Sequence, residues 1–173
     1  MSGEVFLIDT NSLITPHLQY YPFDLAPGFW EQMQNHIKSG RIAILDLVKK
    51  EVLKGNDALK DWMESIAIGN YIDHRSPDIL NQYRQVLQTL QFSPCYKPIA
   101  LKTWSDPDSV ADPWLIATAS VSDYTIITFE KRNGALSPNN PCKSAKIPDI
   151  ADHFNVKVDD LYYMMRALQF KLC

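Results

Sequence analysis

The sequence is poor in the features that mark secreted and membrane proteins. Its three cysteines, Cys95, Cys142 and Cys173, are odd in number and widely spaced, so they indicate neither a disulfide framework nor a zinc site. No apolar stretch approaches the roughly 18 residues of a membrane span, and no basic flank precedes an apolar run at the N-terminus. We therefore expect a cytoplasmic protein that does not enter a membrane.

The chain also lacks low-complexity tracts and a surplus of positive charge. Its 173 residues, 46% hydrophobic and 21% charged, have the composition of a folded protein, and we expect a single domain over residues 1–173. The net charge of -3 argues against a protein that holds nucleic acid through a general positive field. It does not exclude a nuclease, because a cluster of metal-binding acids lowers the total charge.

Apolar runs and amphipathic segments alternate along the chain. Buried strands are predicted at 4–8, 41–45 and 124–128, where apolar and β-branched residues run almost without interruption. The proline-containing stretch 92–109 is predicted to be a loop. This order predicts an α/β protein, a three-layer α/β/α sandwich with a mainly parallel central sheet. The predicted helices are about 28–38, 47–52, 57–67, 77–90, 112–119 and 159–170. Asp46 has the right chemistry to cap the second of them.

Two acids follow predicted strands, which is an unusual place for an ordinary surface charge. Asp9 comes directly after the apolar run 5–8, and Glu130 comes just after the strand 124–128. Because parallel sheets bind ligands at the carboxyl ends of their strands, both acids are expected at the ligand-binding edge. The alternatives are an Asx turn from Asp9 onto Ser12 or a neighbouring amide, and an ion pair between Glu130 and the cations that follow it.

Two further acids lie on predicted helices. Asp112 precedes Pro113, so it is also a good helix N-cap. Glu51 lies beside Lys49 and Lys50, so it also fits a solvated helix face. Convergent carboxylates are nevertheless what Mg²⁺ or Mn²⁺ needs, because these hard cations prefer oxygen ligands and can orient water at a phosphodiester.

Together these acids resemble the motifs of the PIN-domain nucleases. The stretch 8–14, Ile-Asp-Thr-Asn-Ser-Leu-Ile, resembles that family's first motif, and the stretches 47–52 and 112–119 resemble the second and third. Thr-Phe-Glu at 128–130 stands where the family has Thr-x-Asp. The resemblance runs from about residue 4 to about residue 155. With Lys-Ile-Pro-Asp at 146–149, the chain is most similar to a prokaryotic PIN-like subgroup of unassigned function.

The resemblance implies a metal-dependent endoribonuclease acting on single-stranded or structured RNA. Glutamate in place of aspartate at position 130 and a long insert between the second and third motifs depart from the family's pattern. Hydrolysis would leave a 5′-phosphate and a 3′-hydroxyl. The catalytic residues, which would also bind Mg²⁺ or Mn²⁺, are Asp9, Glu51, Asp112 and Glu130. The residues expected to contact RNA are Asn11, Ser12, Thr128, Lys131 and Arg132, and Lys143 and Lys146 are further candidates for contacting its backbone. The candidates for base stacking are Tyr96, Trp104 and Trp114.

Three further roles stay open on the sequence. Many PIN domains are toxins of toxin/antitoxin pairs, so the resemblance also implies a small antitoxin partner and a homodimer. A PIN-like fold kept for nucleic-acid or protein binding without catalysis is an alternative, although three intact acids argue against it. A phosphatase of the haloacid-dehalogenase type is another; that class begins Asp-x-Asp-x-Thr, whereas this chain has Asn11 and Leu13 at the second and third of those positions.

Overall fold

The centre of the protein is a five-stranded parallel sheet in the order β3-β2-β1-β4-β5. The computed structural model describes residues 3–67 and 71–172. Phe6 pairs with Ile42 on one side and with Thr125 on the other, and every strand pair is parallel. The predicted mainly parallel sheet is therefore confirmed. The strands are β1 (Phe6–Ile8), β2 (Ile42–Leu45), β3 (Tyr71–Ile72), β4 (Thr125–Ile127) and β5 (Val158–Asp159).

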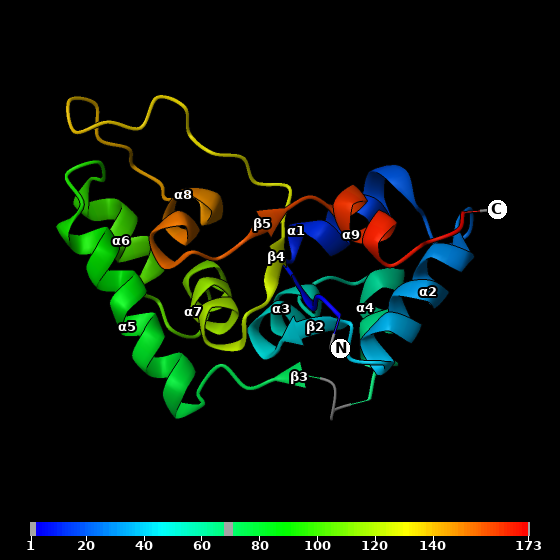
Figure 1. Cartoon of the computed structure of the whole chain (residues 1–173). Helices are drawn as coiled ribbons and strands as arrows, with labels where there is room; N and C mark the ends of the chain where they lie inside the picture. The colour runs from blue at the N-terminus through cyan, green and yellow to red at the C-terminus, as the bar shows by residue number, and fades with distance from the viewer. Residues whose placement is uncertain (1–2, 68–70, 173) are drawn as a thin grey trace.

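Helices cover both faces of this sheet, which completes the predicted α/β/α sandwich. Figure 1 shows α5, α6, α7 and α8 gathered on one side, and α2, α4 and α9 on the other. Within the described residues, no helix combines the length and the apolar character that a membrane crossing requires. The helical segments are α1 (Asn11–Thr15), the π-helical turn η1 (Pro16–Tyr20), α2 (Pro27–Lys38), α3 (Asp46–Val52), α4 (Ala58–Glu64), α5 (Pro77–Phe92), α6 (Pro98–Trp104), α7 (Asp112–Ser122), α8 (Ile147–Ala151), the 3-10 turn η3 (Asp152–Phe154) and α9 (Leu161–Ala167).

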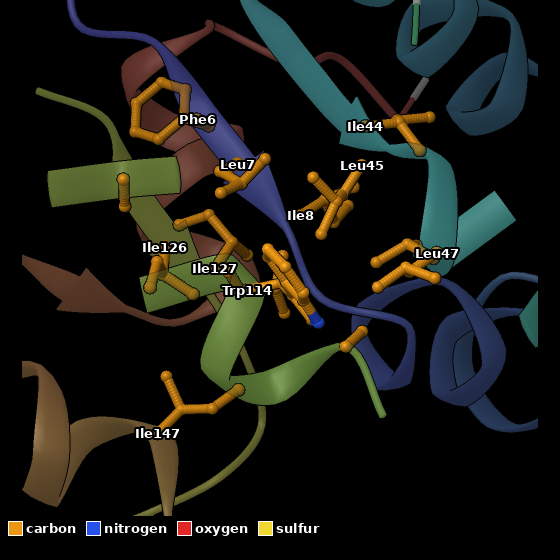
Figure 2. Packing of buried hydrophobic residues seen from close by; sticks show 14 of the residues in the cluster. Phe6, Leu7, Ile8, Ile44, Leu45, Leu47, Trp114, Ile126, Ile127 and Ile147 are labelled. Carbon is orange, nitrogen blue, oxygen red and sulfur yellow. The ribbon is translucent and has the colours of Figure 1, made fainter. Parts of the chain in front are cut away.

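The core is built on β1, whose side chains are buried on both faces of the sheet. Phe6, Leu7 and Ile8 each have 0% exposed surface, as expected for a central strand of a parallel sheet. Figure 2 shows these side chains close to those of β2 and β4 and to Trp114 of α7. This packing fixes the position of the segment that leaves β1, and α7 begins only two residues before Trp114.

The structure differs from the sequence-based expectations in the shorter elements. The predicted loop 92–109 contains α6, because Pro98 occupies the first helical position, where a missing amide hydrogen is tolerated. Two strands were not predicted, β3 and β5. Each has only two residues, too few for a periodic pattern of apolar residues to be visible.

Truncation of a β1 side chain should destabilise the protein far more than truncation of an exposed leucine. Leu7→Ala removes a fully buried side chain and is expected to lower the free energy of unfolding by about 2–5 kcal/mol. Leu25, which is 79% exposed, is the matched control, and Leu25→Ala should change it by less than about 0.5 kcal/mol. Urea unfolding followed by circular dichroism measures both values, and similar losses would contradict the assigned core.

Candidate metal centre

The sheet has its topological switch point between β1 and β4. From β1, the chain reaches β2 and β3 on one side and β4 and β5 on the other. Ligands of open parallel sheets bind at such a point, beyond the carboxyl ends of the strands. Asp9 and Thr128 are the first residues after β1 and β4, and the amide of Asp9 donates to the carbonyl of Ile127 at 2.9 Å. The two strand exits are therefore held side by side.

The Asp9 carboxylate is buried and held by a hydroxyl from the neighbouring strand exit. Asp9 is only 5% exposed, and Thr128 Oγ1 donates to Asp9 Oδ2 at 2.7 Å. The amide of Ser12 donates to the main-chain carbonyl of Asp9. The Asx turn onto Ser12 is therefore not formed, although the carboxylate of Asp9 does have a hydrogen bond from the neighbouring amide of Thr10. The carboxylate faces the β4 exit.

Three residues expected to contact RNA have partners inside the protein. Thr128 Oγ1 also accepts from Asn11 Nδ2 at 3.1 Å, and Asn11 Oδ1 accepts from the amide of Phe129 at 3.0 Å. Ser12 has no exposed surface, and its hydroxyl donates to the carbonyl of Ile127 at 3.1 Å. In this structure Asn11, Ser12 and Thr128 join the two strand exits, and Ser12 cannot reach a ligand in solution.

The two helix acids point toward the same exits. Asp112 is the first residue of α7, but no side-chain hydrogen bond caps this helix, so the N-cap interpretation is wrong. Glu51, near the end of α3, accepts a hydrogen bond from the hydroxyl of Thr10, the residue after Asp9. Glu51 therefore belongs to the β1 exit, whereas the alternative placed it on a solvated helix face.

Glu130 is held by the segment that leads into α8. Lys146 Nζ donates to one carboxylate oxygen at 3.1 Å, and the amide of Ile147 donates to the other at 2.8 Å. The alternative pairing with the adjacent cations is wrong, because Arg132 instead forms a two-bond ion pair with Asp152, at 2.6 and 3.0 Å. Both oxygens of Glu130 thus have a donor already.

The remaining residues expected to contact RNA differ in their surroundings. Lys131 is exposed and forms no ion pair with any residue that the structure describes. Trp104 and Trp114 are 3% and 2% exposed and belong to the core, so their predicted role in base stacking is wrong. Large aromatic side chains are common in protein cores because they bury a large apolar area.

The four carboxylates lie close enough to repel one another. The pKa of Asp9 is raised to about 6, mainly by burial and also by the charges of Glu130 and Glu51, against the opposing hydrogen bond from Thr128. Burial raises the pKa of Asp112 to about 8, with the charges of Asp9, Glu130 and Glu51 acting in the same direction. The positive charge of Lys146 opposes this shift. The site thus holds more negative charge than the protein neutralises.

A divalent cation fits this donor set chemically. The donors are carboxylate oxygens without sulfur or imidazole, which suits Mg²⁺ or Mn²⁺, and a cation would relieve the repulsion that raises the pKa values. The ligand atoms are spread more widely than in a closed cage, because no three of these four residues form a group with all ligand atoms within 4.8 Å. A shared ion therefore needs side-chain rotation, with water completing the coordination, as Mg²⁺ usually retains.

A second group of possible ligands lies at the neighbouring strand exits. Asp46, Asp73 and His74 offer ligand atoms that all lie within 4.8 Å of one another, and within the described part of the chain no other group meets this criterion. Asp46 follows β2, and Asp73 and His74 follow β3. His74 Nδ1 lies 2.7 Å from Asp46 Oδ2, and its ring contacts Trp114 edge-on, 4.8 Å between centroids. Through the buried ring of His74, this half-buried pair contacts the start of α7.

The sequence marks Asp46, but the role that it predicts differs from the one in the structure. Asp46 follows the apolar run 42–45 directly, as Asp9 follows β1, but it was predicted to be a helix cap. In the structure its carboxylate receives the amide of Leu47 and both the amide and the ring of His74. No sequence signal marked His74, because its partner comes from a strand exit 28 residues earlier.

Comparison with protein families gives one match. A family model described as a domain of unknown function, DUF4411, matches residues 6–172, which includes every strand and every helix described above. The chain belongs to the DUF4411 family. No curated protein matches the chain. The DUF4411 description carries no activity, so the resemblance to PIN-domain nucleases stays a prediction from the motifs.

Without metal, the protein should lose stability as the pH rises from about 4 to about 8. The folded state holds protons on Asp9 and Asp112 in this range, whereas an unfolded aspartate ionises near a pKa of about 3.9. The folded state therefore binds more protons, and the free energy of unfolding falls with pH by up to roughly 1.4 kcal/mol per pH unit for each group. Urea unfolding in chelator at several pH values measures this slope.

Asp112→Asn supplies the comparison for this pH dependence. Asparagine does not titrate, so the variant should show a clearly shallower decline between pH 4 and pH 8, most visibly in the upper half of the range, where Asp112 titrates. Asp61→Asn, an exposed change in α4, should keep the wild-type slope. Equal slopes in wild type and Asp112→Asn would show that Asp112 is not the group that titrates.

Proposed function

We propose that the protein is a metal-dependent ribonuclease that hydrolyses RNA phosphodiester bonds. The observation that carries the proposal is the pair of carboxylates, Asp9 and Asp112, at the switch point of a parallel sheet. Burial and the charges of the neighbouring acids raise the pKa values of both. Perturbed acids that gather at such a point are typical of catalytic or metal-binding sites. The PIN-like motifs support the same conclusion from the sequence.

In this proposal the four carboxylates of the chain supply the ligands for the cation. When bound, Mg²⁺ or Mn²⁺ neutralises charge on the scissile phosphate and activates the attacking water. Thr128 and Thr10 orient Asp9 and Glu51 through their hydroxyls, which keeps the carboxylates in place despite their mutual repulsion. Asp112 must give up its proton before it can act as a ligand, so cation binding and proton release are coupled.

Lys146 has a distinct part in this arrangement. Its ammonium group lies 3.1 Å from Glu130 Oε1, and its charge lowers the pKa of Asp112. It therefore lies between two of the acids and partly offsets their charge in the absence of a cation. With phosphate present, the same ammonium group is well placed to interact with a non-bridging oxygen, because cations near a reacting phosphate stabilise its charge.

Cleavage of a 5′-labelled single-stranded RNA tests the proposal. The wild-type protein should cleave it with Mn²⁺ or Mg²⁺ and stop when a chelator is added. Asp9→Asn and Asp112→Asn should each reduce the rate by on the order of 100-fold, the scale seen when one charged group is removed from a catalytic site. Denaturing gels measure the products, and thermal unfolding shows that each variant is folded.

Asp61→Asn is the matched control, because Asp61 is an exposed aspartate of α4. It should cleave at the wild-type rate. Cleavage that continues in chelator, or full activity in both site variants, would refute the proposed mechanism and would identify a contaminating nuclease.

One observation favours a second candidate function, binding without catalysis. Both oxygens of Glu130 already accept hydrogen bonds from Lys146 and Ile147, so protein donors compete with a cation for this acid on both of its oxygens. If the wild-type protein binds RNA but cleaves none with either cation, this second function replaces the first. The toxin role, the antitoxin partner and the homodimer remain proposals that follow only from the family resemblance.

A further inference from the structure

A groove of about 440 Å³ opens directly beside the carboxylate site. Glu130 and Thr128, which hydrogen-bonds to Asp9, are among its lining residues, so the groove adjoins the carboxylate site. Its other walls come from the end of η1, from β5 and from the start of α9. A ligand that reaches the carboxylates can therefore extend along this groove.

The groove carries aromatic side chains that are not packed into the core. Tyr20 is 47% exposed and Tyr162 is 37% exposed, and both line the groove. The ring of Tyr20 lies nearly parallel to that of Phe129, with 6.2 Å between centroids and 29° between planes. Exposed aromatic rings gathered in a hollow next to a reactive site are typical of a ligand-binding surface, and flat rings suit flat ligands.

The charges in the groove favour a ligand with few phosphates. Lys131 is exposed without an ion pair to any described residue, while Arg132 is neutralised by Asp152. Asp159 and Asp160 also line the groove. A duplex presents about one phosphate per 1.7 Å of its axis and is held mainly through many cationic contacts, which this surface does not offer. An unpaired strand can instead bind through its bases.

We propose that this groove binds an unpaired polynucleotide strand, with bases stacked on Tyr20 and Tyr162 and a phosphate near Lys131. The inference rests on the proposed function for its choice of RNA, and it assigns the substrate class: single-stranded segments, with base pairing excluded. Stacking on tyrosine tolerates any base, because every base has a flat face. The groove therefore selects for strandedness and leaves the base sequence unread.

Binding of a fluorescein-labelled octaadenylate to the full chain tests this groove. The titration is followed by fluorescence anisotropy in chelator, so that no metal-dependent cleavage occurs. Tyr20→Ala and Tyr162→Ala should each weaken binding by roughly 5- to 150-fold, the scale of one lost base stack. Tyr20→Phe and Tyr162→Phe keep the ring and should bind within about two-fold of wild type.

Phe92→Ala is the matched control, because Phe92 is 78% exposed at the far end of α5 and lies outside the groove. It should leave binding unchanged. A blunt duplex of the same length should bind more weakly than the single strand. Octadeoxyadenylate bound as tightly as the RNA would support stacking and show that the groove accepts either sugar.

Absence of octaadenylate binding, unchanged binding in both alanine variants, or tighter binding of the duplex would overturn the groove assignment. Because binding is measured without metal, these outcomes are independent of catalysis. A protein that binds the strand through Tyr20 and Tyr162 but cleaves nothing keeps the groove and loses the nuclease proposal. A protein that cleaves RNA at equal rates with and without the two rings keeps the nuclease and loses the groove.

Discussion

The parallel pairing of β1 with β4 determines where every acid of the site can lie. Ile8 pairs with Ile127, and the hydrogen bond from the amide of Asp9 to the carbonyl of Ile127 extends that register by one residue. Thr128, the first residue after β4, then brings its hydroxyl to the Asp9 carboxylate. Both strands are buried in the core (Figure 2). A one-residue shift in their register would turn each buried side chain to the opposite face of the sheet and would separate Thr128 from Asp9, which would disrupt the core and the site together.

The acids of the site repel one another, and the rest of the fold tolerates this repulsion. Buried acids that repel one another lower stability, as at other sites that hold their ligands in advance of binding. The hydroxyls of Thr10 and Thr128, and the ammonium of Lys146, reduce this repulsion without removing it. In the proposed metal centre, this residual charge would favour cation binding, because a cation would relieve the repulsion between the acids.

Much of the fold was predictable because long apolar runs mark β1, β2 and β4, and amphipathic periodicity marks the longer helices. The positions of Asp9 and Asp112 were also predictable, because Asp9 directly follows an apolar run and Asp112 begins a helix. The partners of these acids were not predictable from local pattern. Lys146 meets Glu130 from 16 residues away, and Thr10 meets Glu51 from 41 residues away. Such contacts depend on tertiary packing, and the same holds for the burial of Trp114 and the exposure of Tyr20.

The hydrogen bonds that Lys146 and Ile147 donate to Glu130 hold together the two ends of the loop between Glu130 and Lys146. This loop, which arches away from the sheet before α8 in Figure 1, is closed at its neck by these two bonds and by the amide of Asn133 on the carboxylate of Asp149. Doubling the length of a flexible loop adds only about 0.6 kcal/mol of closure entropy. The loop is tied a second time where Cys142 pairs with Tyr96. The residues between these two anchors can therefore vary in number and sequence while the acids keep their places.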